Sequence, residues 1–108
     1  MFDRERFFAA SACPFETVET AFGSARVYAL TAGEKDALDM SVAREPGVNF
    51  RAKLVQATAR DEDGRPLFLP IDVPELAAAS FVALEPLVDA AIRVNRLGDR
   101  EAQDLRKN

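Results

Sequence analysis

The feature of this sequence that most constrains its fold is an apolar stripe between Asp72 and Asn95. Its members recur in steps of three and four, the spacing that places side chains on one face of an α-helix. The residues at this spacing are Phe81, Leu84, Val88, Ala91 and Ile92. Charged residues such as Asp89 and Arg93 fall between them and would face water. The stripe must be covered by the rest of the chain, so the sequence predicts a small domain organised around this helix.

Capping residues and a proline divide this stretch. Asp72 and Glu75 have the spacing of a capping box, and Ser80 can cap a second helix that carries the stripe. Pro86 has no N–H to donate to the carbonyl of Val82. We therefore expect a kink or a break near Pro86.

A glycine and a capping residue also predict how the chain closes. The pair Leu97-Gly98 is typical of a helix stop, in which glycine takes the left-handed conformation. Asp99 can then cap a last short helix that runs through Ala102 and Leu105.

Two further helices are predicted upstream. The first opens with a capping box at Thr31 and Glu34 and ends where Glu45-Pro46-Gly47 interrupts the pattern. The second follows Asn49, which can cap it, and should stop near Arg60. The inward residues of the two helices are expected to be Leu38 and Val42 in the first and Phe50, Leu54 and Ala57 in the second.

Residues 15–30 have strand character instead. β-Branched and aromatic residues lie around Gly23-Ser24, which indicates two short strands joined by a turn there. A lone hairpin is marginal in water, so it should lie against the helices or pair with another chain through its free edge. The predicted fold is mainly α, a small helical domain of about four to five helices with a short N-terminal β-hairpin. Residues 1–108 form one domain, with an arm at 1–14, the hairpin at 15–30 and a helical part at 31–108.

The arm holds three phenylalanines, Phe2, Phe7 and Phe8, among charged residues and is closed by Pro14. Exposed aromatic surface is generally avoided unless it docks somewhere. The arm is therefore either a short helix that packs on its own domain or an extension that grips a neighbouring subunit.

The composition argues against several classes of function. With 18 acidic and 14 basic residues the net charge is −4, and no basic cluster suited to nucleic-acid phosphates occurs. No histidine is present to activate Cys13, the single cysteine, or any serine, so we expect no catalytic residue. A single free cysteine fits a reducing cytoplasm. No apolar segment reaches the length of a membrane span, and we expect no membrane association.

Two groups of acidic residues have the side-chain type that metal ions bind. Asp36 and Asp39 lie in the first turns of a predicted helix, where they would favour the helix dipole. The run that starts at Asp61 resembles a calcium loop, but Pro66 stands where such a loop needs glycine. The run is therefore predicted to be a turn, and no metal or cofactor is expected.

Four segments together resemble the tail assembly chaperones of long-tailed phages and prophages. They are VYALTAGEKD at 27–36, FRAKLV at 50–55, DEDGRPLF at 61–68 and LVDAAIRVNRLG at 87–98, followed by a final Lys107-Asn108. The likeness covers roughly residues 18–108, whereas residues 1–15 have no equivalent in it.

This resemblance implies a protein that is not an enzyme and acts in the host cytoplasm during tail morphogenesis. Such chaperones are thought to coat the tape measure protein and to help recruit tail tube subunits before the tube polymerises. Many are also made as a longer product by a programmed frameshift. The family has no catalytic or cofactor residues to carry over. We expect a homo-oligomer with the tape measure protein and the tail tube protein as partners.

A holding chaperone needs apolar surface that stays exposed until its client arrives. The candidate partner-binding residues are Phe7, Phe8, Phe68, Phe81 and Leu87. Each could instead be an ordinary core residue. Two other functions stay open at this point: a small helical adaptor or regulatory domain that binds one host protein, and an enzyme subunit whose carboxylates meet in a cleft.

Overall fold

The structure, a computed structural model, describes residues 1–97. The predicted stop at Gly98 and the last helix through Ala102 and Leu105 lie outside this range. The elements, in chain order, are α1 (Arg4–Ala10), β1 (Phe15–Thr20), β2 (Gly23–Tyr28), α2 (Ala32–Arg44), α3 (Phe50–Thr58), β3 (Ala59–Arg60), a 3₁₀ turn (Pro70–Asp72), α4 (Val73–Ala78) and α5 (Phe81–Val94).

The prediction of a mainly α fold is wrong. Residues 1–97 form five α-helices and an antiparallel sheet of three strands in the order β1-β2-β3, so the fold is mixed α and β. The missing strand, β3, follows α3 without any loop and pairs Ala59 with Val27 of β2. Both residues are almost fully buried, because the inner face of the sheet forms one wall of the core. The predicted hairpin is thus part of a sheet that joins it to the helical part.

The hairpin turn lies two residues earlier than predicted. Thr20 pairs with Gly23, which leaves Ala21 and Phe22 as the loop. The Thr20 hydroxyl donates to the carbonyl of Gly23 at 2.7 Å and accepts from the N–H of Phe22 at 3.0 Å. Gly23 has φ 117°, a backbone conformation that glycine adopts without strain. Glycine is therefore needed as the first residue of β2 rather than inside the turn.

Of the helix caps predicted within residues 1–97, only the one at Thr31 forms as expected, and the predicted cap Asp99 lies outside this range. The Thr31 hydroxyl accepts from the N–H of Glu34 at 3.1 Å, and the Glu34 carboxylate accepts from the N–H of Thr31 at 2.9 Å. Asn49 and Ser80 stand at the starts of α3 and α5 but make no side-chain cap bond. Asp72 accepts from the N–H of Leu69 at 2.8 Å, so its carboxylate closes the 3₁₀ turn instead of capping α4.

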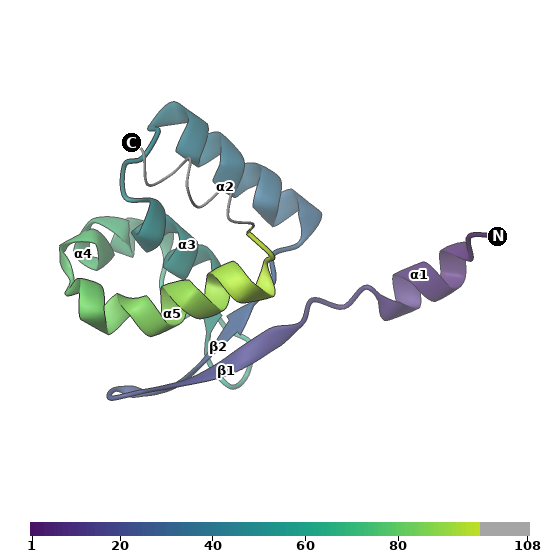
Figure 1. The fold of residues 1–108 in the computed structure, drawn as a ribbon, viewed down its shortest axis with the longest axis horizontal. Coiled ribbons are helices and arrows are strands. Elements are labelled where there is room, and N and C mark those ends of the chain that lie inside the picture. The colour runs from purple at the N-terminus through teal and green to yellow at the C-terminus, as the bar shows by residue number, and fades with distance from the viewer. Residues whose placement is uncertain (98–108) are drawn as a thin grey trace.

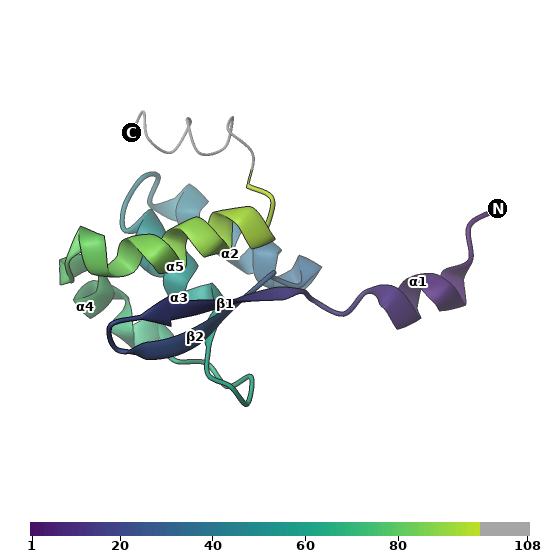
Figure 2. The ribbon, with the colours of Figure 1, turned by 60° about the horizontal axis from the view of Figure 1, so that its bottom comes forward.

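Helix α3 lies at the centre of the fold and contacts α2, α4, α5 and β2. Its buried residues are Ala52, Leu54, Val55 and Thr58, so of the predicted inward set only Leu54 is buried, whereas Phe50 and Ala57 are half-buried. Helix α5 lies against α3 and across the hairpin, and its buried residues are Leu84, Leu87, Val88, Ala90 and Ala91. Both α3 and α5 have neighbouring elements on more than one side (Figures 1 and 2). Each of these helices therefore buries more than one stripe of residues.

Helix α5 is continuous through Pro86, so the predicted break is absent. It ends at Val94 with Asn95 as its C-cap, and the next residue, Arg96, takes the left-handed conformation with φ 52°. The N–H of Leu97 donates to the carbonyl of Ile92 at 3.0 Å, and the N–H of Arg96 donates to that of Arg93 at 3.1 Å. This is a Schellman stop with arginine at the place where glycine is usual. The stop therefore comes two residues before Gly98.

The arm does not pack on its own domain. Helix α1 buries none of its residues, and it lies well outside the body in both ribbon views (Figures 1 and 2). The carbonyl of Pro14 accepts a hydrogen bond from the N–H of Ala29 at 2.8 Å, which extends the β1–β2 ladder by one residue. Proline also restricts the residue before it, Cys13, to extended conformations. The chain therefore leaves the sheet in the direction of β1 and carries α1 away.

Candidate functional site

A groove of about 420 Å³ lies between the start of α3, α4 and the outer side of α5. Its floor is apolar and consists of the core residues Leu76, Leu84 and Val88. Small residues of α4 and its flanks, Ala77 and Ala79, also line it. Because alanine side chains fill little space, they leave the space between α3 and α5 open here. The groove is open to solvent at its rim, where Phe81, Glu85 and Asp89 are exposed, whereas the floor residues are only 5–8% exposed.

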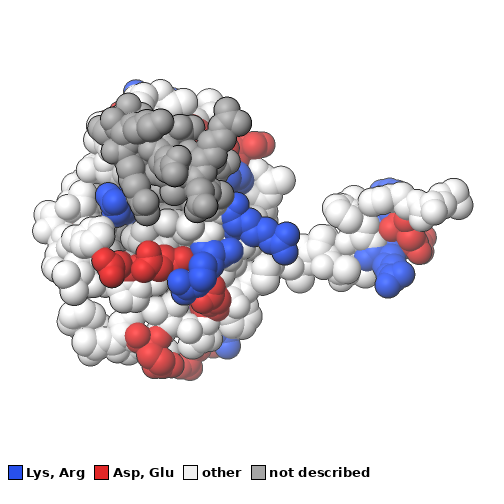
Figure 3. Space-filling model, in the orientation of Figure 1, with Lys and Arg blue, Asp and Glu red and all other residues white. Residues whose placement is uncertain are grey.

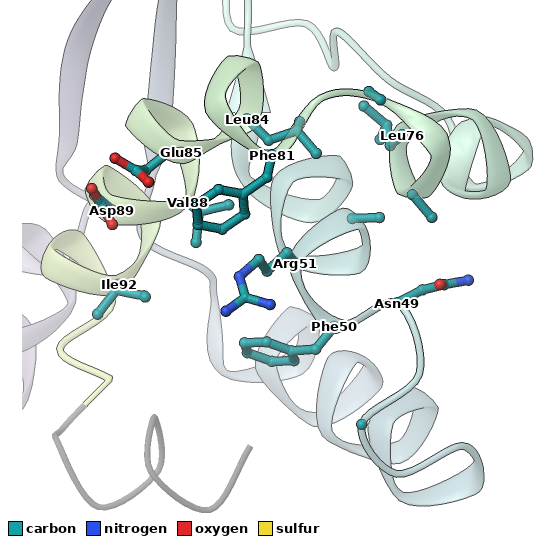
Figure 4. Close-up of a pocket in the computed structure, with 14 residues that line it drawn as sticks. Asn49, Phe50, Arg51, Leu76, Phe81, Leu84, Glu85, Val88, Asp89 and Ile92 are labelled. Carbon is teal, nitrogen blue, oxygen red and sulfur yellow. The ribbon is translucent and has the colours of Figure 1, made fainter. Parts of the chain in front are cut away.

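Aromatic and basic side chains project into the groove (Figure 4). Phe81, in the first turn of α5, is 54% exposed. The guanidinium of Arg51 lies over its ring, with 5.2 Å between the guanidinium carbon and the ring centre. Phe50 lines the same wall from the start of α3. A cation placed over an exposed ring orients that ring without covering it.

Two carboxylates, Glu85 and Asp89, line the side of the groove formed by α5 (Figure 4). They stand four residues apart, so both lie on one face of the helix. Within residues 1–97, neither comes within ion-pair distance of a lysine or arginine. The groove therefore combines an apolar floor with an acidic edge, which suits an apolar segment that carries basic residues.

The second exposed surface is the arm helix α1. Phe2, Phe7 and Phe8 are 75%, 50% and 60% exposed. Their rings pack on one another, with centres 5.4 Å apart for Phe2 and Phe7 and 5.2 Å apart for Phe7 and Phe8. The Arg4 guanidinium lies 5.1 Å from the centre of the Phe8 ring. We call Phe2, Phe7 and Phe8 the arm cluster.

The five predicted partner-binding residues do not form one site. Phe7 and Phe8 lie together in the arm cluster, and Phe81 lies in the groove. Phe68 is half-buried and packs against the core. Leu87 is only 8% exposed and belongs to the core, because the α5 face that carries it is covered. Leu87 is therefore not part of an exposed surface.

Sequence reasoning missed Arg51, Glu85 and Asp89 as parts of the groove. The sequence predicts only that Asp89 faces water, since no local pattern shows which charged residues lie beside an opening between helices. Their spacing gave a partial signal, because Phe81, Glu85 and Asp89 follow one another at steps of four.

The outer face of the sheet carries an alternating stack of arginine and aromatic side chains. Arg26 lies over the ring of Phe15, Phe15 packs on Tyr28, and Arg60 lies over Tyr28. Arg60 also forms an ion pair with Glu34 at 3.2 Å. The stack holds these rings and charges within the subunit, so this face offers less free apolar surface than the groove or the arm.

The acidic groups considered as metal ligands have structural roles. Asp39 pairs with Lys35 at 2.8 Å. Asp61 accepts from the N–H groups of Asp63 and Arg65, which makes the acidic run a side-chain-closed turn, as predicted. No group of three or more acidic, cysteine or histidine side chains within residues 1–97 is placed to hold a metal ion.

Charge on the front face of the body is mixed. Figure 3 shows acidic and basic side chains next to one another there and on the arm. One exposed pair joins α5 to the sheet, because Arg93 donates to both carboxylate oxygens of Glu16 at 3.0 and 3.2 Å. This hydrogen bonding raises the pKa of Arg93 above its usual value.

None of the helices in residues 1–97 is both long enough and apolar enough to cross a bilayer. A search of protein-family models, curated proteins and solved structures gave no significant match to this chain.

Proposed function

We propose that this protein is a phage or prophage tail assembly chaperone, a binding protein without enzymatic activity that acts in the host cytoplasm. The observation that carries the proposal is the open groove, whose apolar floor is formed by Leu76, Leu84 and Val88. The sequence resemblance stated above supports the same role. Phe81, exposed at the rim of this groove, gives a holding protein the apolar contact it needs, because its client must find a surface that water covers only temporarily.

The shape of the groove favours a helical client. An amphipathic helix binds such a groove by placing residues at steps of three and four against the floor. The tape measure protein, the client that the resemblance implies, is a very long helical protein. Basic residues that flank its apolar stripe would pair with Glu85 and Asp89 along one edge. Tail tube subunits, the second implied partner, would be recruited to the resulting complex.

The proposal predicts a tape measure protein encoded by a neighbouring gene, and co-expression with that protein tests it. We expect the two proteins to elute together on size exclusion. Phe81→Asp is expected to weaken capture at least about tenfold, because a central aromatic contact is replaced by a charge. Aspartate is favourable in the first turn of a helix, so α5 should still form.

Phe22→Asp is the matched control. Phe22 is 87% exposed at the hairpin turn and lies outside both the groove and the arm. It should leave capture unchanged. Separate elution of the wild-type protein and the tape measure protein at several salt concentrations would contradict the proposal and favour an adaptor that binds a different protein.

A further inference from the structure

The arm cluster lacks a partner within its own subunit. Helix α1 is seven residues long and buries none of them. A helix this short is marginal in water by itself, even with the cap that Asp3 provides to the N–H of Arg6 at 3.1 Å. Its stability in this form therefore calls for a surface on which Phe7 and Phe8 can pack.

We propose that α1 of one copy docks in the groove between α3, α4 and α5 of a second copy, so that each copy gives one arm and receives one. This inference goes beyond the proposed function, since association between copies needs no tape measure protein. Three observations select a second copy as the occupant: the direction of the arm, its charge and its area.

The direction of the arm favours another copy over its own groove. The Pro14–Ala29 hydrogen bond continues the ladder beyond β1, and Pro14 keeps Cys13 extended. Helix α1 therefore lies beyond one end of the body. Helix α4 and the first turn of α5, which line the groove, lie toward the opposite end (Figure 1). A docked arm within one chain would have to reverse direction within residues 11–13.

The charges of the arm and the groove are complementary. Arg4 lies between Phe7 and Phe8 on the same face of α1, at steps of three and four. It forms no ion pair within residues 1–97, and neither do Glu85 and Asp89 in the groove. Seating the rings on the apolar floor would place the Arg4 guanidinium beside these carboxylates. The contact would therefore pair charges that the single subunit leaves in water.

The apolar area is sufficient if the exchange is reciprocal. At the observed exposures the three rings of the arm cluster leave roughly 400 Å² of surface to bury, and the groove loses roughly half as much. Two reciprocal contacts then bury roughly 1,200 Å², at the lower end of the size range of stable, specific interfaces. One contact alone would bury about half of this and would be weak.

Sedimentation velocity of the full chain, with no client present, tests the inference. We expect the wild-type protein to pass from monomer to a larger species as its concentration rises. A chain that remains monomeric at about 0.5 mM, where even a millimolar complex is populated, would overturn the proposal. Because no client is present, this outcome is independent of the tape measure experiment.

Three variants locate the contact. Phe7→Ala combined with Phe8→Ala removes the arm rings and keeps residues that favour helix, and Phe81→Asp alters the groove. Each should weaken association at least about tenfold. Phe22→Ala, which removes an even more exposed ring elsewhere, should associate like the wild type. Loss in the arm variant with full association of the Phe81→Asp variant would mean that arms pair with arms, and would refute docking in the groove.

Mixing the arm variant with the Phe81→Asp variant gives the sharpest test. The first keeps a working groove and the second a working arm, so together they can form one arm–groove contact. Cys13 is the only cysteine, and a dye attached there allows one variant to be followed in the mixture. We expect a one-to-one complex that is weaker than the wild-type assembly but stronger than the association of either variant alone. A mixture that associates no better than its components would exclude the exchange.

Discussion

The side-chain oxygen of Asn95, at the end of α5, accepts a hydrogen bond from the backbone N–H of Leu30, with 2.7 Å between the two atoms. The Asn95 amide nitrogen donates to the carbonyls of Tyr28 and Ala91 at 3.3 and 3.0 Å. One side chain thus satisfies the backbone where β2 leads into α2 and ties it to the last described helix. Asn95 also lies in the segment 87–98, one of the four that carry the family resemblance. Its hydrogen bonds give it a structural role in this fold.

Asn95→Ala should destabilise the fold by about 1–3 kcal/mol, because it leaves the N–H of Leu30 and the carbonyl of Tyr28 without their partner. Urea unfolding followed by circular dichroism measures this. Asn95→Asp keeps the acceptor for Leu30 but loses both donors, so its stability should fall between those of the alanine variant and the wild type. An alanine variant within about 0.5 kcal/mol of the wild type would show that water replaces the side chain without cost.

Arg96→Gly should stabilise the protein by about 0.5–1 kcal/mol. The residue holds φ 52° in the Schellman stop of α5, a conformation that costs an L-residue more than it costs glycine. Thermal unfolding would report a rise in Tm. Asn49→Gly provides the comparison, since Asn49 has φ 55° but asparagine tolerates this region, so its gain should be smaller. Equal or opposite effects at the two positions would contradict this account.

Leu87→Ala should cost about 2–5 kcal/mol of unfolding free energy, as expected for a leucine removed from a packed core. Leu69→Ala, at an exposed leucine outside the core, should change stability by less than about 0.5 kcal/mol. Chemical denaturation of the two variants side by side is the measurement. Similar stabilities of the two variants would mean that Leu87 is not a core residue and is again a candidate for partner binding.

Phe8→Asp should leave the fold intact while it weakens self-association or client capture. Helix α1 buries nothing in its own subunit, so the body loses no contact when Phe8 changes. Far-ultraviolet circular dichroism and the urea midpoint should therefore match those of the wild type. A large loss of helical signal would instead mean that Phe8 packs inside its own domain.

The Arg93–Glu16 pair should make stability depend on salt but not on pH in the neutral range. The hydrogen bonds to Glu16 raise the pKa of Arg93, so the charged, stabilising form is fully present below the usual arginine pKa and is lost only as the pH rises through the raised pKa. Glu16→Gln should remove most of the response of the unfolding midpoint to added salt that this pair contributes. An unchanged response to salt would indicate that the pair is screened in solution.

Local chemistry was readable from the sequence where a signal and its partner are close together. The Thr31–Glu34 capping box and the Asp61 turn each depend on neighbours within four residues, and both form. Asn49, Ser80 and Asp72 are equally good caps by residue type. Asp72 instead closes the 3₁₀ turn before α4, and the other two leave their helices without a side-chain cap.

Features that depend on distant parts of the chain could not be predicted. Strand β3 is two residues long, and only its pairing with Arg26 and Val27 of β2 makes it a strand. The spacing in α5 identified an apolar face, but it could not show that Leu87 would be covered and Phe81 left half exposed. The groove exists because Leu87 is covered and Phe81 is not. Its position therefore depends on how the helices pack rather than on a pattern in the sequence.

The hydrogen bond between Pro14 and Ala29 also has a mechanical consequence. It places the attachment point of the arm in line with β1, so a pull on the arm acts along the strand rather than across it. The rungs of the ladder then share the load in shear instead of opening one after another. A partner that binds α1 could therefore pull on this subunit without separating the edge strand β1 from the sheet.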